Sequence, residues 1–265
     1  RLGVAESVNA IKDGKIDAFF WVGGLPTAAV TDLANTPGVK IKMIDHAEAV
    51  AALGYEVAAL GDGRWNGVAI LSRVGLSDVV MNLDDQPEFD GSVEPRAIGA
   101  TCGGVRIWSV YVPNGREPDH DHYAYKLRWF SALKATVERE QSAAGADALP
   151  YAVIGDFNVA PNDDDVWDMA EFVNATHVTP AEREAVEALK TTGLDEVMPR
   201  ALKGKPYTFW DYRALAFQKA MGMRIDLIMA NAAFRARVSD AWIDRDERKI
   251  KGGSDHAPVV VDLSI

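Results

Sequence analysis

The chain has 265 residues, 48% of them hydrophobic and 25% charged, which is typical of one large or two small globular domains. Its formal net charge of −11 argues against broad, nonspecific affinity for nucleic acids, which requires Lys and Arg to neutralise phosphates, but allows a local basic cleft or a cation site. The single cysteine, Cys102, excludes an internal disulfide, the apolar runs are too short to span a bilayer, and no cleavable signal begins the chain, so we expect a cytoplasmic protein.

The first part of the chain alternates between helix-like and strand-like stretches. Gly14 and Gly54 are placed to end helices, and Pro26 suits a first helical turn. A strict apolar–polar alternation such as "VKIKMID" indicates a strand. We therefore predict helices over residues 6–14, 25–35 and 46–54 and strands over 16–22 and 39–45.

Strands dominate after Tyr55. We predict strands over residues 65–72, 104–111, 151–157, 224–230 and 257–263, and helices over 122–141 and 179–190. The second helix opens with Thr179 and Glu182, which have the spacing of a capping box. Many strands with a few interposed helices predict two sheets packed face to face with helices outside.

Polar residues cluster where these strands begin or end. "YVPNG" places Tyr111 and Asn114 at the exit of one strand. "GDFN" ends another and carries Asp156 and Asn158, which point to the same side because they are two residues apart. Taken singly, each of these motifs is typical of turns.

Two further motifs give this cluster a chemical meaning. Asp226 lies inside an apolar strand and is costly to bury unless it accepts hydrogen bonds, so we expect it to hold His256. Asp255 is a candidate ligand for a hard cation, and Asp156 a candidate to orient or deprotonate a water molecule. A cation and an imidazole would neutralise charge on a phosphoryl group, so the four motifs together indicate metal-assisted phosphodiester hydrolysis.

The motifs "RWNGVAILSR", "EPR", "YVPNG", "YKLRWF", "GDFNVAP", "YTFWDYR", "RIDLIMA" and "GGSDHAPVVVDL" occur in this order from about Ala47 to Ile265. This part of the chain resembles bacterial exodeoxyribonuclease III, of the endonuclease/exonuclease/phosphatase superfamily. The resemblance implies an α/β fold, a four-layer sandwich of two packed, mainly antiparallel sheets flanked by helices. It also implies a DNA repair nuclease that needs Mg²⁺ or Mn²⁺, cuts duplex DNA at abasic sites and removes 3′ nucleotides or blocking groups.

The resemblance also implies roles for particular residues. Asp156 would activate the water with Asn158 beside it, and Tyr111 would contact the scissile phosphate. Asp226 would orient His256 toward that phosphate, and Asp255 would serve the metal. The residues implied to contact DNA are Trp210, packed against the sugar at the lesion, and Asn114, Arg96 and Lys126 near the backbone; for Arg96 and Lys126 a solvated surface charge is the alternative.

The front of the chain departs from this family. The family opens with a strand carrying "WN" and continues to a strand ending in "QE", whose Asn and Glu belong to the metal site, and neither motif is present here. Residues 8–50 instead resemble a stretch of the TAXI-type solute-binding proteins of TRAP transporters. We therefore predict a foreign N-terminal segment over residues 1–46 and a nuclease domain over 47–265.

We hypothesise that this foreign segment docks as a surrogate for the missing strand–helix–strand unit. Its stretches 16–22, 26–35 and 39–45 have the same order of elements, and a sheet without them would expose strand edges. Asp45 would then lie near the position of the family's Glu and is a weak candidate metal ligand, with a helix N-cap as the alternative.

Three functions compete. The first is a metal-dependent DNA repair nuclease that acts as a monomer on duplex DNA with an abasic site or a 3′ end, with no membrane and no obligate protein partner. The second is a catalytically inactive fusion protein that retains the nuclease fold. The third is a solute-binding module of the transporter type, and a superfamily branch acting on inositol phosphates or sphingolipid ranks low because "TFWDYR" and "RIDLIM" resemble the DNA repair branch.

Overall fold

The computed structural model describes residues 4–15, 33, 35–37, 50–61, 66–145, 148–249 and 253–264. The helix predicted over 6–14 is present as α1 (Val4–Lys12), and Gly14 follows it with φ of 64°. The strands predicted over 16–22 and 39–45, Asp45 and the proposed docking lie outside the described residues. These predictions therefore stay predictions.

A six-stranded sheet forms the centre of the molecule, with strand order β3-β4-β5-β6-β9-β7. Strands β5 and β6 are parallel, and the other neighbours are antiparallel. Its strands are β3 (Ser77–Met81), β4 (Ala97–Cys102), β5 (Val105–Tyr111), β6 (Tyr151–Asp156), β7 (Asp195–Glu196) and β9 (Asp226–Ala230).

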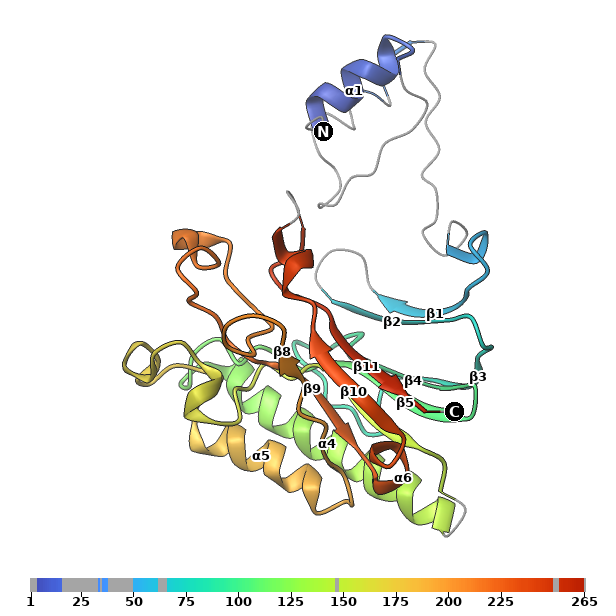
Figure 1. Cartoon of the computed structure of the whole chain (residues 1–265), viewed down its shortest axis with the longest axis vertical. Coiled ribbons are helices and arrows are strands. Elements are labelled where there is room, and N and C mark those ends of the chain that lie inside the picture. Colours follow the sequence, from blue (N-terminus) through green and yellow to red (C-terminus); the bar gives the residue numbers. More distant parts are fainter. Residues whose placement is uncertain are drawn as a thin grey trace.

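Two smaller sheets pack on one face of the central sheet (Figure 1). One contributes Val68 and Ile70 to a buried cluster with Ile98 of β4, and the other contributes Ala241 to a cluster with Ile228 of β9. The first sheet consists of β1 (Glu56–Gly61) and β2 (Gly67–Ser72), and the second of β8 (Arg200–Ala201), β10 (Val238–Ile243) and β11 (Val259–Leu263).

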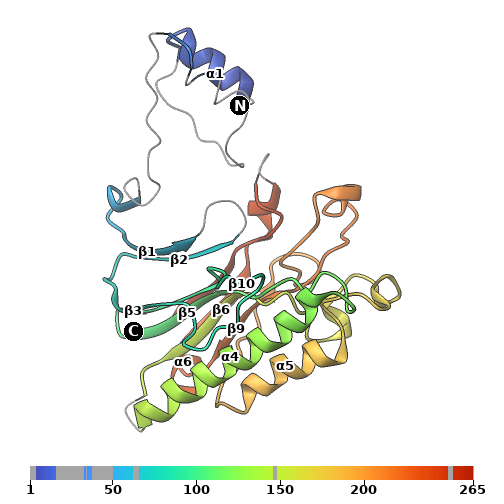
Figure 2. The same ribbon diagram turned by 180° about the vertical axis from the view of Figure 1, so that it is seen from behind.

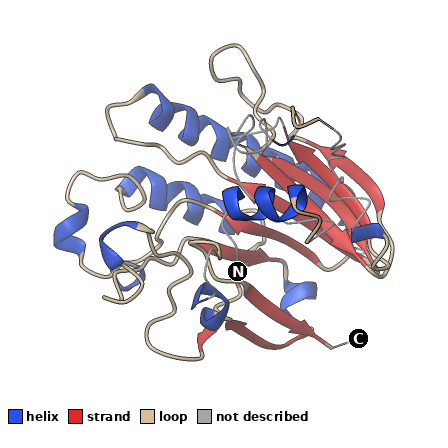
Figure 3. Ribbon diagram, turned by 90° about the horizontal axis from the view of Figure 1, so that it is seen from above, coloured by secondary structure: helices blue, strands red, loops and turns tan. Residues whose placement is uncertain are grey.

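Helices α4 (Asp121–Ala144) and α5 (Pro180–Lys190) cover the opposite face (Figure 2). Trp129 and Leu133 of α4 and Leu189 of α5 are fully buried in the apolar layer under the central sheet. Figure 3 shows the molecule from above, with the helices in blue and the strands in red. The shorter helices are α6 (Ala232–Arg235) and the 3₁₀ turns η2 (Asp163–Asp165), η3 (Met169–Phe172), η4 (Arg213–Leu215) and η5 (Arg245–Lys249).

This architecture confirms the expected α/β sandwich of two packed layers of strands with helices outside. Helix α4 is the crossover between the parallel strands β5 and β6, so both strands run toward the same edge of the sheet. None of the helices that the structure describes is long and apolar enough to cross a membrane.

The predicted capping box of α5 is also present. The Thr179 hydroxyl accepts the Glu182 N–H at 3.3 Å, and the Glu182 carboxylate accepts the Thr179 N–H at 3.1 Å. We expect Thr179→Ala to lower the free energy of unfolding by about 1 kcal/mol, measured by urea denaturation. Ser131→Ala, on the exposed side of α4, is the matched control and should change it by less than about 0.5 kcal/mol. Equal stability of the two variants would contradict a stabilising cap.

Candidate active site

Strand register gathers three polar side chains into one row at the edge of the central sheet. Tyr111 of β5 lies opposite Asp156 of β6, and Asp156 lies opposite Asp226 of β9. β5 and β6 end at this edge, whereas β9 begins there because it is antiparallel to β6. Residues far apart in the sequence therefore become neighbours across adjacent strands.

The segment of Thr208 and Phe209 holds the motif that contains His256 at the same edge. Phe209 forms bridges with both Met223 and His256, and the Ala257 N–H donates to the Thr208 carbonyl at 2.7 Å. The Thr208 hydroxyl, which is fully buried, accepts the Asp226 N–H at 3.1 Å. The Thr208–Phe209 segment therefore holds the chain just before β11 beside the start of β9.

His256 and Asp226 are in direct contact. The His256 Nδ1 lies 2.8 Å from Asp226 Oδ2, and the Phe209 ring packs 5.0 Å from the imidazole. Burial alone would lower the pKa of His256, but the hydrogen bond to Asp226 and the charges of Asp226 and Asp156 raise it to about 9. The imidazole is therefore protonated at neutral pH, and the contact leaves its Nε2 for another partner.

The loop after β6 fixes the carboxylate of Asp156. Gly155 has φ of 135°, and a Cβ atom there would collide with the Val110 carbonyl oxygen, so glycine is required. Asp156 Oδ1 accepts the Asn158 N–H at 2.8 Å, and Oδ2 accepts the Asn158 side-chain amide at 3.0 Å. Asn114 donates to Asn158 Oδ1 at 3.0 Å, so the two predicted motifs are joined.

Negative charge is concentrated in this row. Burial and the charge of Asp226 raise the pKa of Asp156 to about 7. Burial, together with the charges of Asp156 and Asp255, raises the pKa of Tyr111, so its phenol stays neutral and keeps an O–H donor. A cation or a positively charged substrate group placed here would relieve the repulsion among the carboxylates.

One of the two predicted metal ligands, Asp255, lies among the described residues, and its role as a ligand stays a prediction. Asp255 acts electrostatically on Tyr111 and His256, so its carboxylate lies near the row and suits a hard cation. Among the residues described, however, no group of three or more His, Cys, Asp or Glu is arranged to hold a metal ion. The other candidate ligand, Asp45, lies outside them. The described residues thus provide only part of a coordination shell.

Burial changes the interpretation of two predicted DNA contacts. Arg96 is only 5% exposed and pairs with Glu94 at 2.6 Å, while its guanidinium lies 4.9 Å from the centre of the Tyr111 ring. Lys126 is fully buried and donates to Glu182 at 2.5 Å. Both charges are paired inside the protein, so neither is the solvated surface charge of the alternative, and their contact with a DNA backbone stays a prediction.

Trp210 and Asn114 differ in exposure, and the contacts of both with DNA stay predictions. Trp210 is 1% exposed and packs edge-on against Phe217, with ring centroids 5.2 Å apart. The guanidinium of Arg245 lies 5.5 Å from its ring and covers it. Asn114 is exposed beside the row and remains available to a substrate.

Sequence reasoning missed several residues at this edge. Arg116 is exposed directly after "YVPNG" and lines, with Phe172 and His177, an open pocket of about 630 Å³. The sequence could have indicated Arg116, because it lies two residues after the predicted site residue Asn114. Glu182 was interpreted only as a helix cap, and no sequence signal links His177 to the site.

Comparisons with known proteins bear on the family. A model described as "Endonuclease/Exonuclease/phosphatase family" matches residues 19–256. "Exodeoxyribonuclease III" of Haemophilus influenzae is 25% identical over 236 residues, covering 83% of this chain and 86% of that protein.

Two solved structures are similar over most of their length. A 3′-5′ exonuclease from Neisseria meningitidis has a TM-score of 0.75 and 34% identity, covering 83% of each chain. A Neisseria 3′ phosphatase bound to a product DNA hairpin has a TM-score of 0.77 and 32% identity, covering 89% of this chain and 93% of that one. These findings confirm the resemblance to exodeoxyribonuclease III, while the likeness of the front segment to transporter proteins stays a prediction. The chain belongs to the endonuclease/exonuclease/phosphatase family.

Proposed function

We propose that this protein is a divalent-metal-dependent DNA repair nuclease of the exodeoxyribonuclease III type. The observation that carries this proposal is the contact between His256 and Asp226, 2.8 Å long, in the same row as Asp156 and Tyr111. A protonated imidazole beside an oriented carboxylate suits attack of water on a phosphodiester. The relatives, which include exonucleases and a DNA-bound 3′ phosphatase, support the same reaction class.

Three side chains of the candidate site have separate roles in the proposed reaction. Asp156, held by two N–H groups of Asn158, accepts the proton of the attacking water, and its raised pKa suits a base near neutrality. His256 donates from Nε2 to a phosphoryl oxygen and carries positive charge toward it. Tyr111 donates its phenolic O–H to the same group. A bound divalent cation would add charge stabilisation of the phosphoryl oxygens.

The proposal also covers the identity of the metal ion and of the substrate. We propose Mg²⁺ or Mn²⁺, held by Asp255 with Asp45 as a further ligand. The substrate is duplex DNA with an abasic site or a 3′ end, contacted by Asn114 and bound by a monomer without an obligate protein partner. We also propose a cytoplasmic location.

A second candidate is a catalytically inactive family member. The front of the chain, before Ala47, lacks the family's opening "WN" and "QE" motifs, and the described residues provide only part of a metal site. Such a protein would keep the fold without turnover, because the reaction relies on the cation's charge.

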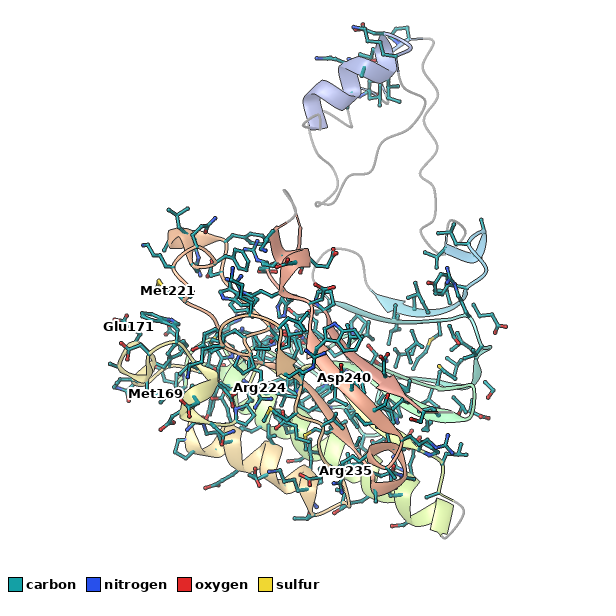
Figure 4. All side chains as sticks on the ribbon, in the orientation of Figure 1. Met169, Glu171, Met221, Arg224, Arg235 and Asp240 are labelled. Atoms are coloured by element: carbon teal, nitrogen blue, oxygen red, sulfur yellow. The ribbon has the colours of Figure 1, made fainter. Side chains whose placement is uncertain are left out.

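A duplex oligonucleotide with one abasic-site analogue separates the two candidates. With the nuclease we expect cleavage in Mg²⁺ or Mn²⁺, none in EDTA, and a loss of roughly 100-fold or more in His256→Ala, because that side chain faces the developing charge. Arg235→Ala, at the opposite end of β9, is the control and should cleave like the wild type (Figure 4). A folded wild type that cleaves with neither metal would establish the inactive alternative.

A further inference from the structure

His177 occupies an unusual backbone position next to the proposed active site. It lies between η3 and α5 with φ of 80°, a left-handed conformation that costs a residue other than glycine about 1 kcal/mol or more. Its N–H donates to Glu182 at 3.0 Å, and its carbonyl accepts the Ala160 N–H at 2.8 Å. Glycine would make both backbone bonds without the conformational cost, so the imidazole needs a role of its own.

The imidazole makes one short polar contact. His177 Nδ1 lies 2.6 Å from the carbonyl oxygen of Asn158, which can only accept, so Nδ1 carries the proton. Burial and the charge of Lys126 lower the pKa of His177 to about 4, against the opposing effects of the Asn158 bond and Glu182. The ring is therefore a neutral donor whose tautomer is fixed by its partner.

Lys126 donates to the same carbonyl oxygen at 2.7 Å, so Asn158 is held from both directions. Glu182 in turn accepts from Lys126 at 2.5 Å and from the His177 N–H at 3.0 Å. Beyond Asn158 the contacts continue to both carboxylate oxygens of Asp156. A continuous hydrogen-bonded path thus leads from Glu182, through two donors, to the proposed base.

We infer that His177 is a positioning residue: its Nδ1–H fixes the Asn158 carbonyl and, through Asn158, the carboxylate of Asp156. The inference rests on the proposed nuclease function. The backbone N–H and the side-chain amide of Asn158 both donate to Asp156, so a shift of the Asn158 backbone would displace the carboxylate. A displaced Asp156 slows proton transfer more than it weakens DNA binding.

Two substitutions at this position test the role. His177→Gly removes the donor and also relieves the backbone cost, so we expect normal thermal stability, kcat lowered about 10- to 100-fold and KM changed less than about twofold. His177→Asn keeps an amide N–H near the place of Nδ1 and tolerates the left-handed backbone, so it should recover part of the lost kcat. The matched control is Asp90→Gly, an exposed residue with φ of 49° on another loop, which should keep the wild-type kcat.

A second readout does not depend on turnover. The ¹⁵N chemical shifts of the imidazole in the DNA-free wild type should identify His177 as the Nδ1–H tautomer. An Nε2–H tautomer would overturn the inference even if all variants are active. So would a folded His177→Gly protein with wild-type kcat, or an asparagine variant no better than the glycine one. A wild type without cleavage in either metal would remove the proposed function and the positioning role with it, whatever the tautomer.

Discussion

Asp156→Asn is expected to lower kcat on an abasic-site duplex by about 10²- to 10⁴-fold, because the amide cannot accept a proton from the attacking water. The substitution preserves the shape of the side chain and the hydrogen bond from the Asn158 N–H to Oδ1. The loss should therefore be in kcat, measured under saturating DNA, with KM changed far less. Single-turnover cleavage would separate the chemical step from product release.

The melting temperature of Asp156→Asn should not fall along with its kcat. Burial and the charge of Asp226 raise the pKa of Asp156 from 3.8 to about 7, so ionising this group costs more in the folded than in the unfolded protein. This cost develops as the pH rises from the unfolded value through the folded one, and at pH 8 the wild type bears it in full. At that pH the Asn variant should melt at the same or a higher temperature.

The control for this experiment is Asp84→Asn, an exposed carboxylate that pairs with Arg139 on the surface. It should keep wild-type kcat, since a surface ion pair contributes little to the stability of the fold. A kcat for Asp156→Asn within about tenfold of the wild type would contradict the role of Asp156 as base. A large drop in its melting temperature at pH 8 would instead indicate a structural role.

The sequence predicted those parts of the molecule where local pattern and topology agree. The runs predicted as strands at 104–111 and 151–157 are β5 and β6, and the helix predicted between them is α4. Asp226 could be paired with His256 because a carboxylate in an apolar strand needs a partner. The register that aligns Tyr111, Asp156 and Asp226 could not be read from the sequence, because it depends on how separate strands pair.

The missed elements and the missed partners each have a physical cause. Strand β4 was not predicted because it is buried on both faces and consists largely of small residues around Gly99, so it shows no alternation. Arg96 and Lys126 were predicted to face DNA because a sequence shows a charge but not the buried carboxylate that pairs with it. Those carboxylates come from Glu94 and Glu182, and only the tertiary fold brings the second within reach of Lys126.

Arg224 is the buried charge with the largest expected effect on stability. Its side chain is fully buried, donates to both oxygens of Asp165 at 2.6 and 2.8 Å, and also pairs with Glu196 (Figure 4). Arg224→Met would leave the buried Asp165 and the partly buried Glu196 without this cation, so we expect the free energy of unfolding to fall by about 3–5 kcal/mol in urea denaturation. Adding Asp165→Asn and Glu196→Gln to that variant should recover part of the loss, because neutral amides are less costly to bury.

The surface pair of Arg200 with Asp240 offers a matched control for Arg224. It has the same bidentate geometry, at 2.9 and 2.6 Å, but both side chains are exposed. Arg200→Met should therefore cost less than about 1 kcal/mol, and equal losses in the two variants would contradict the role of burial. Arg224 lies two residues before Asp226, and its own N–H donates to the Asp165 carbonyl at 2.8 Å. The folded fraction of Arg224→Met should thus also lose kcat, since the start of β9 determines where Asp226 meets His256.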